Sequence, residues 1–186
     1  LAAVPPGGER PVIEGVSFTL TAGDGLGIIG PSAAGKTTLV RMLVGLWSPA
    51  MGAARLDGAS LDQWDPDDLG AHLGYLPQQV ELFDGTIAQN IARMTPTATS
   101  EAIIAAARSA GVHDMVVRLE HGYDNEVGDN GSHLSAGQRQ RIGLARALYG
   151  DPFLVVLDEP NSNLDAEGEA ALESAMRDRT TLVIAH

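Results

Sequence analysis

The amino-acid sequence predicts an α/β domain, with a mainly parallel sheet and helices on both of its faces. Short apolar runs alternate with helical patterns, as in residues 26–30 and then 36–46. The strongest apolar run, at residues 153–160, ends in two acidic residues and a proline. A helical block at residues 86–149 separates the strands on either side of it. Strands that alternate with helices favour parallel pairing, because each helix returns the chain to the same end of the sheet.

The first third of the chain predicts further β structure around this sheet. Residues 12–20 are mostly strand-like, and "GAARLDG" at residues 52–58 suits an edge hairpin. Residues 26–30 form a short apolar run that is consistent with a buried strand. Apolar residues recur at helical spacing in residues 36–46, and "HLGYLPQ" predicts a strand that ends at Pro77. We therefore expect an N-terminal antiparallel β subdomain beside the parallel core.

The rest of the chain is predicted to be mainly helical. Residues 86–149 contain an alanine-rich segment and a glycine-rich break, and the last of these helices ends at "GDP", residues 150–152. Another helix near residues 165–177 leads to a final strand, "TLVIA". We expect the block at about residues 86–149 to be a helical subdomain inserted into the core.

Composition narrows the class of protein. The 186 residues suit one domain, and the net charge of −12 argues against a broad nucleic-acid surface. The absence of cysteine excludes disulfides and thiolate metal sites. The sequence contains neither an apolar run of membrane-spanning length nor a signal peptide. Because the sequence begins without methionine and stops after a strand-like run, we expect it to be a fragment of a longer chain.

A phosphate-binding loop is predicted between a strand and a helix, where "GPSAAGKTT" fits the pattern G-x-x-x-x-G-K-S/T. Its glycines let backbone N–H groups turn toward phosphate oxygens, and the helix N-terminus adds a partial positive charge. The lysine can reach the β- and γ-phosphates, and the first threonine can bind Mg²⁺. The alternative is a glycine-rich turn with a solvated lysine. The residues expected to contact the nucleotide are Gly30, Pro31, Ser32, Ala33, Ala34, Gly35, Lys36, Thr37 and Thr38.

A second acidic element is predicted where the strongest strand ends. Asp158 lies at the edge where α/β sheets bind ligands, so its carboxylate suits Mg²⁺. Glu159 follows directly, and a carboxylate there can orient and deprotonate an attacking water. Taken alone, such an acidic pair is more often a helix cap or a solvated turn. Together with the phosphate loop, it favours a nucleotide-hydrolysing site.

The segment "LSAGQ", residues 134–138, opens a predicted helix. Ser135 and Gln138 have the spacing of a capping box, in which each side chain bonds the backbone of the other residue. This explanation accounts for the helix start but not for the small pair Ala136 and Gly137. Small residues leave backbone N–H groups accessible, so the segment also predicts a second anion site.

With these motifs in place, the chain resembles the nucleotide-binding domain of an ABC transporter. "LSAGQ" is similar to the family signature LSGGQ, with Ala136 in place of the first glycine. The resemblance implies a P-loop NTPase fold, with the helical subdomain inserted in a RecA-like core. The six matching motifs are Walker A at residues 30–38, the Q-loop glutamine Gln78, the signature, Walker B at residues 153–159, the D-loop at residues 162–165 and the switch histidine His186.

The resemblance also implies a mechanism. In this family two domains dimerise head to tail and sandwich two ATP molecules, so Ser135, Gly137 and Gln138 are expected to contact ATP held by a second copy. Glu159 would polarise water, and Gln78 would sense Mg²⁺ and water while linking to a transmembrane part. The implied catalytic residues are Glu159, His186, Gln78 and Lys36, and the implied metal ligands are Thr37, Gln78 and Asp158.

Two stretches, "YLPQQVELFDGTIAQNI" and "VGDNG", are similar to the exporter branch of the family. "PPGGERP", "GPSAAGKT" and "DEPNSNLD" are similar to bacterial type I secretion ATPases, which export proteases, lipases and haem-binding proteins. The resemblance implies polypeptide export and a place on the cytoplasmic face of the bacterial inner membrane. The implied partners are a second copy of the domain, a transmembrane domain, a periplasmic adaptor and an outer-membrane channel, and they include no nucleic acid.

Two departures from the family pattern are visible. Pro5 stands where exporters usually carry an aromatic residue that stacks on adenine, so the sequence does not predict how the base is bound. The stretch from Asp165 to His186 is a few residues shorter than in relatives, and we expect the missing residues near 176–180.

Two other functions are compatible with parts of the sequence. The first is a soluble ABC-type ATPase in DNA repair or translation, against which the net charge and the exporter-like stretch argue. The second is a module that binds nucleotide without hydrolysing it. The presence of Lys36, Asp158, Glu159 and His186 argues against this second alternative.

Overall fold

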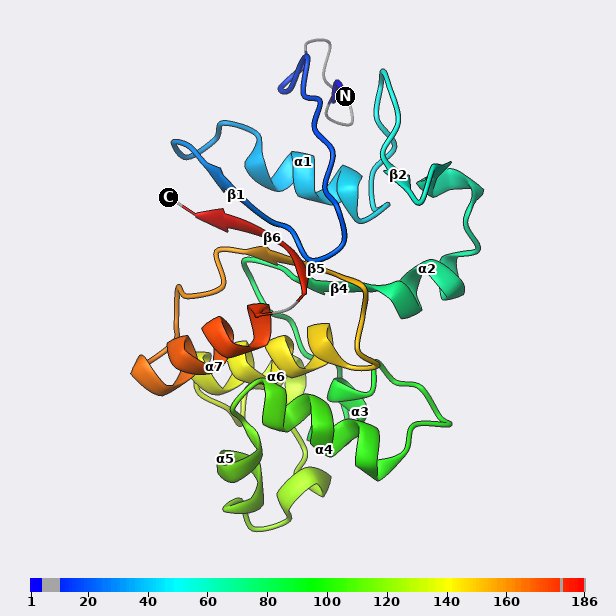
Figure 1. Ribbon diagram of the computed structural model, residues 1–186. Coiled ribbons are helices and arrows are strands. Elements are labelled where there is room, and N and C mark those ends of the chain that lie inside the picture. The colour runs from blue at the N-terminus through cyan, green and yellow to red at the C-terminus, as the bar shows by residue number, and fades with distance from the viewer. Residues whose placement is uncertain (5–10, 178, 186) are drawn as a thin grey trace.

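A four-stranded parallel sheet forms the centre of the molecule (Figure 1). The computed structural model describes residues 1–4, 11–177 and 179–185. The strand order is β1, β6, β5, β4, and all neighbouring pairs are parallel. The strands are β1 (Gly25–Ile29), β4 (Leu73–Leu76), β5 (Leu154–Asp158) and β6 (Thr180–Ala185). The predicted α/β class with a mainly parallel sheet is therefore confirmed.

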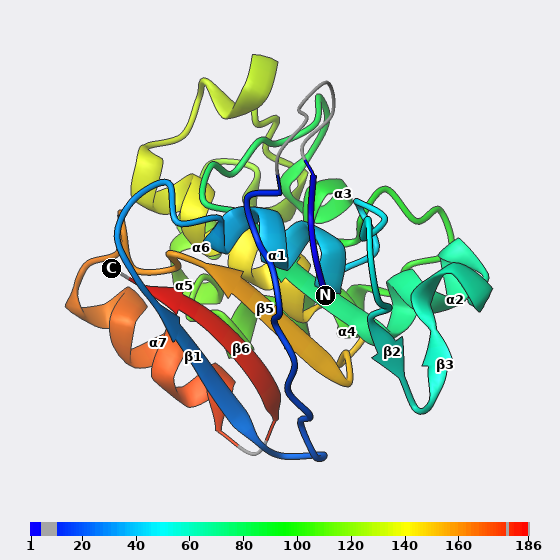
Figure 2. The same cartoon turned by 90° about the horizontal axis from the view of Figure 1, so that it is seen from above.

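Helices cover both faces of this sheet. Figures 1 and 2 show α1 on one side and α6 and α7 on the other. Strand β5 shows the cause: Val156 packs with Val40 of α1, whereas Val155 and Leu157 pack in the cluster that contains Ile142 of α6. Alternate side chains of β5 thus enter two cores, as expected of a central parallel strand. These helices are α1 (Lys36–Leu43), α6 (Ala136–Leu148) and α7 (Ala166–Met176).

The chain between β4 and β5 is helical, as the sequence predicts. Thr86 and Thr99 cap two of these helices by accepting hydrogen bonds from backbone N–H groups. Ala106 and Ala107 are buried in the same core cluster as α6. The helices between β4 and α6 are α3 (Ile87–Ile91), α4 (Ser100–Ser109) and α5 (His113–Val117), and short 3₁₀ turns lie at Gly122–Asp124 and Asp129–Gly131. Another short 3₁₀ turn, Leu61–Gln63, precedes β4. That this block is a separate inserted subdomain stays a prediction.

The antiparallel part is smaller than the sequence predicts. Strands β2 (Arg55–Leu56) and β3 (Ala59–Ser60) form the expected hairpin. The strand predicted at residues 12–20 is wrong, because this segment makes only isolated backbone contacts with the described chain start, through Val12, Ile13 and Val16. Its apolar residues face no continuous partner strand in the described chain, so the pattern does not produce a ladder.

Three further features differ from the predicted ones. Helix α1 ends at Leu43, not at Leu46, because Gly45 has a positive φ of 78° and turns the chain away. Strand β1 lies at the edge of the described sheet, and its Ile29 is 78% exposed, so the expectation of a buried strand is wrong. Helix α2 (Pro66–His72) was not predicted; Asp65 caps it. Within the described residues, no helix is both long and apolar enough to cross a lipid bilayer.

Candidate functional site

The phosphate loop connects β1 to α1, as the sequence predicts. Gly35 has φ 87°, and a Cβ there would lie 2.9 Å from Cγ1 of Ile13, so both dihedral and space require glycine. Ala33 also adopts a left-handed conformation, with φ 64°. Gly30 differs: an added Cβ would make only ordinary contacts at 3.8 Å or more. No protein contact within the described chain requires glycine there, so a requirement for glycine at this position depends on the bound phosphate and stays a prediction.

Lys36 is the first residue of α1, and it folds back over the loop. Its Nζ donates to the carbonyl oxygens of Gly30 at 2.6 Å and Pro31 at 3.1 Å, and the residue is 8% exposed. No side chain caps α1, and its first turn contains no acidic residue. The amine and the helix N-terminus therefore concentrate positive charge at this loop, which suits an anionic ligand.

Asp158 ends β5 with its carboxylate buried. Neither carboxylate oxygen has a hydrogen-bond partner among the described residues. Burial raises the pKa of Asp158, and the Glu159 charge adds to this, whereas Thr37, Arg41 and Lys36 oppose it. The Thr37 hydroxyl lies near enough to favour the charged carboxylate without meeting hydrogen-bond geometry. A buried, unpartnered carboxylate beside a hydroxyl is the donor set that a hard divalent cation takes.

Gln78 and Glu159 meet at the same edge of the sheet. They follow the neighbouring parallel strands β4 and β5, and Nε2 of Gln78 donates to Oε2 of Glu159 at 2.8 Å. Glu159 has a left-handed backbone with φ 51°, and its N–H donates to the carbonyl oxygen of Ile184 in β6 at 3.1 Å. A strained non-glycine residue held from two sides is a typical feature of functional sites. The structure thus brings two of the predicted catalytic residues into contact.

A magnesium site would combine a few protein donors with phosphate oxygens. No group of three or more His, Cys, Asp or Glu side chains able to hold a metal occurs in the described part of the chain. Thr37 and Asp158 are nevertheless adjacent, and Gln78 has an amide oxygen at the same edge. Mg²⁺ usually takes one or two carboxylates and completes its shell with water and substrate phosphates, so this donor set fits it.

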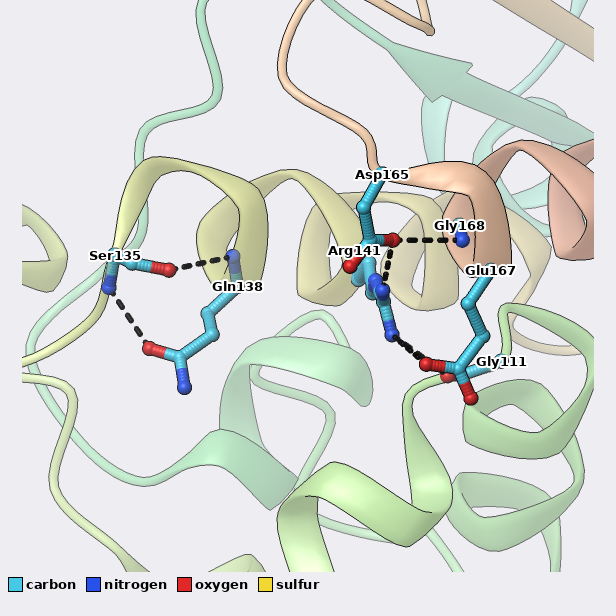
Figure 3. A network of polar contacts seen from close by, with 7 residues as sticks. All are labelled: Gly111, Ser135, Gln138, Arg141, Asp165, Glu167 and Gly168. Atoms are coloured by element: carbon cyan, nitrogen blue, oxygen red, sulfur yellow. Dashed lines mark hydrogen bonds and ion pairs between the residues drawn. The ribbon is translucent and has the colours of Figure 1, made fainter.

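The signature segment forms the predicted capping box at the start of α6. Figure 3 shows Ser135 Oγ accepting from the Gln138 N–H at 3.2 Å, while Gln138 Oε1 accepts from the Ser135 N–H at 2.8 Å. A Cβ on Gly137 would lie 2.9 Å from the carbonyl oxygen of Asn163, so this glycine permits a close backbone approach. Ala136 is exposed, so the added methyl meets no such restriction.

The predicted residues fall into two groups in space. The phosphate loop, Asp158, Gln78 and Glu159 lie at the carboxyl ends of β1, β5 and β4. The signature begins α6, which lies on the opposite side of the sheet from α1 (Figure 1). His186 and Pro5 lie outside the described residues; β6 ends at Ala185, which pairs with Ile29 beside the phosphate loop.

Two residues with structural links to the site were not predicted. Gln140 and Arg141 are buried although polar, and both contact the segment that follows Glu159. The only signal in the sequence is "QRQR", which places polar side chains among the buried positions of α6. Helical periodicity assigns such residues to solvent, because it does not identify the polar partners that bury them.

The fold and the loop together define a nucleotide-binding α/β domain of the P-loop class. Comparison with known proteins narrows this class. The family model described as "ABC transporter" matches residues 13–162. The type I secretion system ATP-binding protein PrsD of Rhizobium meliloti (strain 1021) is 61% identical over 191 residues, which cover 100% of this chain and 33% of PrsD. An ATP-dependent lipid A-core flippase of Burkholderia thailandensis is 44% identical over 95% of the chain and 30% of that protein.

The structural comparison agrees with the sequence comparisons. The structure titled "Structure of a bacterial Atm1-family ABC exporter with ATP bound" matches with a TM-score of 0.87 and 39% identity, covering 96% of this chain and 32% of the other. The chain belongs to the ABC transporter family and is an ATP-binding domain of its exporter type. It spans about a third of the length of these relatives.

Proposed function

We propose that this domain hydrolyses ATP and thereby powers the export of polypeptides in a type I secretion transporter. The single observation that carries the hydrolytic part is the pair of Gln78 and Glu159, whose 2.8 Å hydrogen bond lies at the sheet edge that also presents Asp158 and the phosphate loop. The 61% identity to a type I secretion ATP-binding protein supports the polypeptide cargo.

Residues 30–38 bind the triphosphate. Their backbone N–H groups and the uncapped start of α1 face the phosphates, and Lys36 exchanges its contacts with Gly30 and Pro31 for phosphate oxygens. Because the amine is already buried at the loop, little rearrangement is needed to place its charge. Thr37, Asp158 and Gln78 would hold Mg²⁺, which would supply neutralisation of the phosphate charge.

Glu159 orients the attacking water and accepts its proton. The Gln78 amide holds one carboxylate oxygen, and the Glu159 backbone is tied to β6, so the carboxylate is positioned before the nucleotide arrives. His186 follows β6 and would contact the γ-phosphate. Because phosphoryl transfer to water needs mainly positioning and charge neutralisation, these few groups are sufficient.

A second copy completes each site in this proposal. Ser135, Gly137 and Gln138 begin α6 on the other side of the sheet from α1, so they serve the ATP held by the phosphate loop of the partner. In the longer transporter, the further partners are a transmembrane domain, a periplasmic adaptor and an outer-membrane channel. The domain then lies on the cytoplasmic face of the bacterial inner membrane.

Steady-state phosphate release tests the hydrolytic part. We expect Glu159→Gln to retain ATP binding, to slow hydrolysis by about 100-fold to 1,000-fold and to trap an ATP-bound dimer, because the proton acceptor is lost while every phosphate contact remains. Light scattering measures the dimer. A variant that hydrolyses ATP normally, or that stays monomeric at high concentration with ATP and Mg²⁺, contradicts the proposal.

The cargo needs a separate experiment with the full-length transporter in proteoliposomes. An unfolded polypeptide carrying a secretion signal should stimulate ATP hydrolysis, whereas lipid A should not. Stimulation by lipid A instead would favour the flippase activity named for one group of relatives and overturn polypeptide export.

A further inference from the structure

One face of α6 is joined to the segment that connects β5 with α7. Gly137, Gln140 and Arg141 have the spacing i, i+3, i+4, so they share a face of the helix. All three contact residues 160–168, which begin directly after Glu159. The start of α6 and the end of β5 are therefore linked through side chains as well as through the sheet.

The first two contacts are close, and the second is buried. The backbone at Gly137 approaches the Asn163 carbonyl so closely that a Cβ would lie 2.9 Å from that oxygen. Gln140 is 2% exposed, and its Nε2 donates to the Pro160 carbonyl oxygen at 3.1 Å. This amide thus contacts the residue that immediately follows Glu159.

Arg141 makes the third contact, through three acceptors (Figure 3). One guanidinium nitrogen, Nη2, forms an ion pair with Oδ1 of Asp165. The other, Nη1, donates at 3.4 Å to Oε2 of Glu167 and at 3.4 Å to the Gly111 carbonyl oxygen. The Arg141 side chain is 11% exposed. Because the guanidinium has left bulk water, these acceptors hold it in one orientation.

Asp165 has two roles in this contact. The same oxygen, Oδ1, accepts from the Gly168 N–H at 2.9 Å and so caps α7. The Gly168 amide, and then Arg141, hold the pKa of Asp165 below its usual value. A Cβ on Gly168 would lie 3.2 Å from the Arg141 Nε, so the glycine leaves room for the guanidinium. The same Asp165 oxygen therefore both caps α7 and forms the ion pair with Arg141.

We propose that Arg141 is a positioning residue, which fixes the start of α7 and residues 160–164 against the signature helix. This inference rests on the proposed function. In the head-to-tail pair, Ser135 serves the partner's ATP while Glu159 serves the ATP of its own chain. A rigid connection between α6 and the segment after Glu159 therefore couples one ATP site to the other within a single chain.

A double-mutant cycle with Arg141→Gln and Asp165→Asn tests the link. Asparagine is itself a good N-cap, so Asp165→Asn removes the ion pair but retains the start of α7. We expect each variant to lower kcat about tenfold and to leave ATP affinity of the phosphate loop unchanged, because positioning alone is lost. The double variant should be no slower than the slower single variant.

Two controls separate positioning from general damage. Arg118→Gln removes an exposed arginine at the end of α5 and should leave kcat unchanged. Arg141→Lys keeps the charge for Asp165 but loses the fork that also reaches Glu167 and Gly111, so it should restore part of kcat. Losses of kcat that add in the double variant, or a parallel loss of ATP affinity, overturn the proposal.

Hydrogen–deuterium exchange measures the link without catalysis. Arg141→Gln should speed amide exchange at residues 165–168 and at 135–138, while exchange in β5 stays slow. Unchanged exchange at both helix starts overturns the inference even if the domain hydrolyses ATP. A wild-type chain without hydrolysis, together with faster exchange in the variant, refutes the proposed function but leaves the mechanical link standing.

Discussion

The starts of α1 and α6 are both candidate anion sites, yet they are built in opposite ways. Helix α6 begins with a complete capping box, in which Ser135 and Gln138 satisfy each other's backbone N–H groups. Helix α1 begins at Lys36, after Gly35 and with no side-chain cap, and beside it lies the Asp158 carboxylate, which has no hydrogen-bond partner among the described residues. The α6 start is stable by itself, whereas the α1 start has polar groups that a ligand would satisfy.

Because of this difference, the α1 start suits binding of a ligand within the chain, and the α6 start suits completion of a site on a second molecule. The α1 start is arranged to hold a charged ligand, because a buried amine and a buried carboxylate lie together there. The α6 start is ordered before any ligand arrives, so it suits a surface presented to a second molecule. Variants at the two helix starts should therefore differ in kind, with ligand binding affected at α1 and the helix itself at α6.

The largest effect is expected at Lys36, the only lysine of the chain. Lys36→Ala should lower kcat/KM for ATP by about 100-fold to 1,000-fold, because the cation that stabilises the transferred phosphate is lost. The fold should remain, since the Lys36 amine donates to the Gly30 and Pro31 carbonyl oxygens of its own loop, and their backbone geometry does not depend on it. Activity and circular dichroism together check this.

Chemical labelling gives an independent control for Lys36. A lysine-directed reagent has one side-chain target, and ATP with Mg²⁺ should protect it in a mass-spectrometric assay. Labelling that is equally fast with and without ATP would contradict binding at this loop.

A smaller effect is expected at the α6 start, on stability. Gly137→Ala should lower the free energy of unfolding by about 1–2 kcal/mol, because the methyl meets the Asn163 carbonyl and the clash exceeds the gain in helix propensity. Ala136→Gly, one residue earlier and exposed, should cost at most about 1 kcal/mol. Urea unfolding measures both, and a stabilised Gly137→Ala variant would contradict the close approach.

The smallest effect on stability is expected at Asp158, and activity changes in the opposite direction. Asp158→Asn should slow Mg²⁺-dependent hydrolysis yet raise the free energy of unfolding by about 1 kcal/mol at neutral pH, because a buried carboxylate that accepts no hydrogen bond from the described residues is costly. Unfolding is measured without nucleotide or Mg²⁺. Asp84→Asn, at an exposed position, is the matched control and should change neither quantity.

The pH dependence of stability should also differ between Asp158→Asn and the wild type. The pKa of Asp158 is raised in the folded state, mainly by burial, so the unfolded chain releases its proton first as pH rises. The wild type therefore loses stability from the ordinary aspartate pKa up to the raised one, and the loss persists above it. Asp158→Asn should lack that decline. A variant whose stability falls with pH as steeply as the wild type would show that another group causes it.

Local patterns predicted the parts of the site that depend on neighbours in sequence. The phosphate loop, the capping box of Ser135 and the acidic end of β5 all have their causes within a few residues. Helical spacing also identified the helical character of residues 86–149. Patterns failed where a partner was required, because residues 12–20 lack a continuous strand beside them in the described chain. The end of α1 was also missed, although its cause, the positive φ of Gly45, is local.

The sequence by itself determined the class of fold and the chemistry of each motif, because periodicity, caps and glycine positions act over short distances. Only the tertiary structure decided which motifs meet. Gln78 and Glu159 are 81 positions apart, and parallel pairing of β4 and β5 brings them to a hydrogen bond. By helical spacing alone, Arg141 would be assigned to solvent. In the structure it packs against Asp165 and Gly168. Burial of polar groups depends on partners distant in the chain, and spacing alone does not identify them.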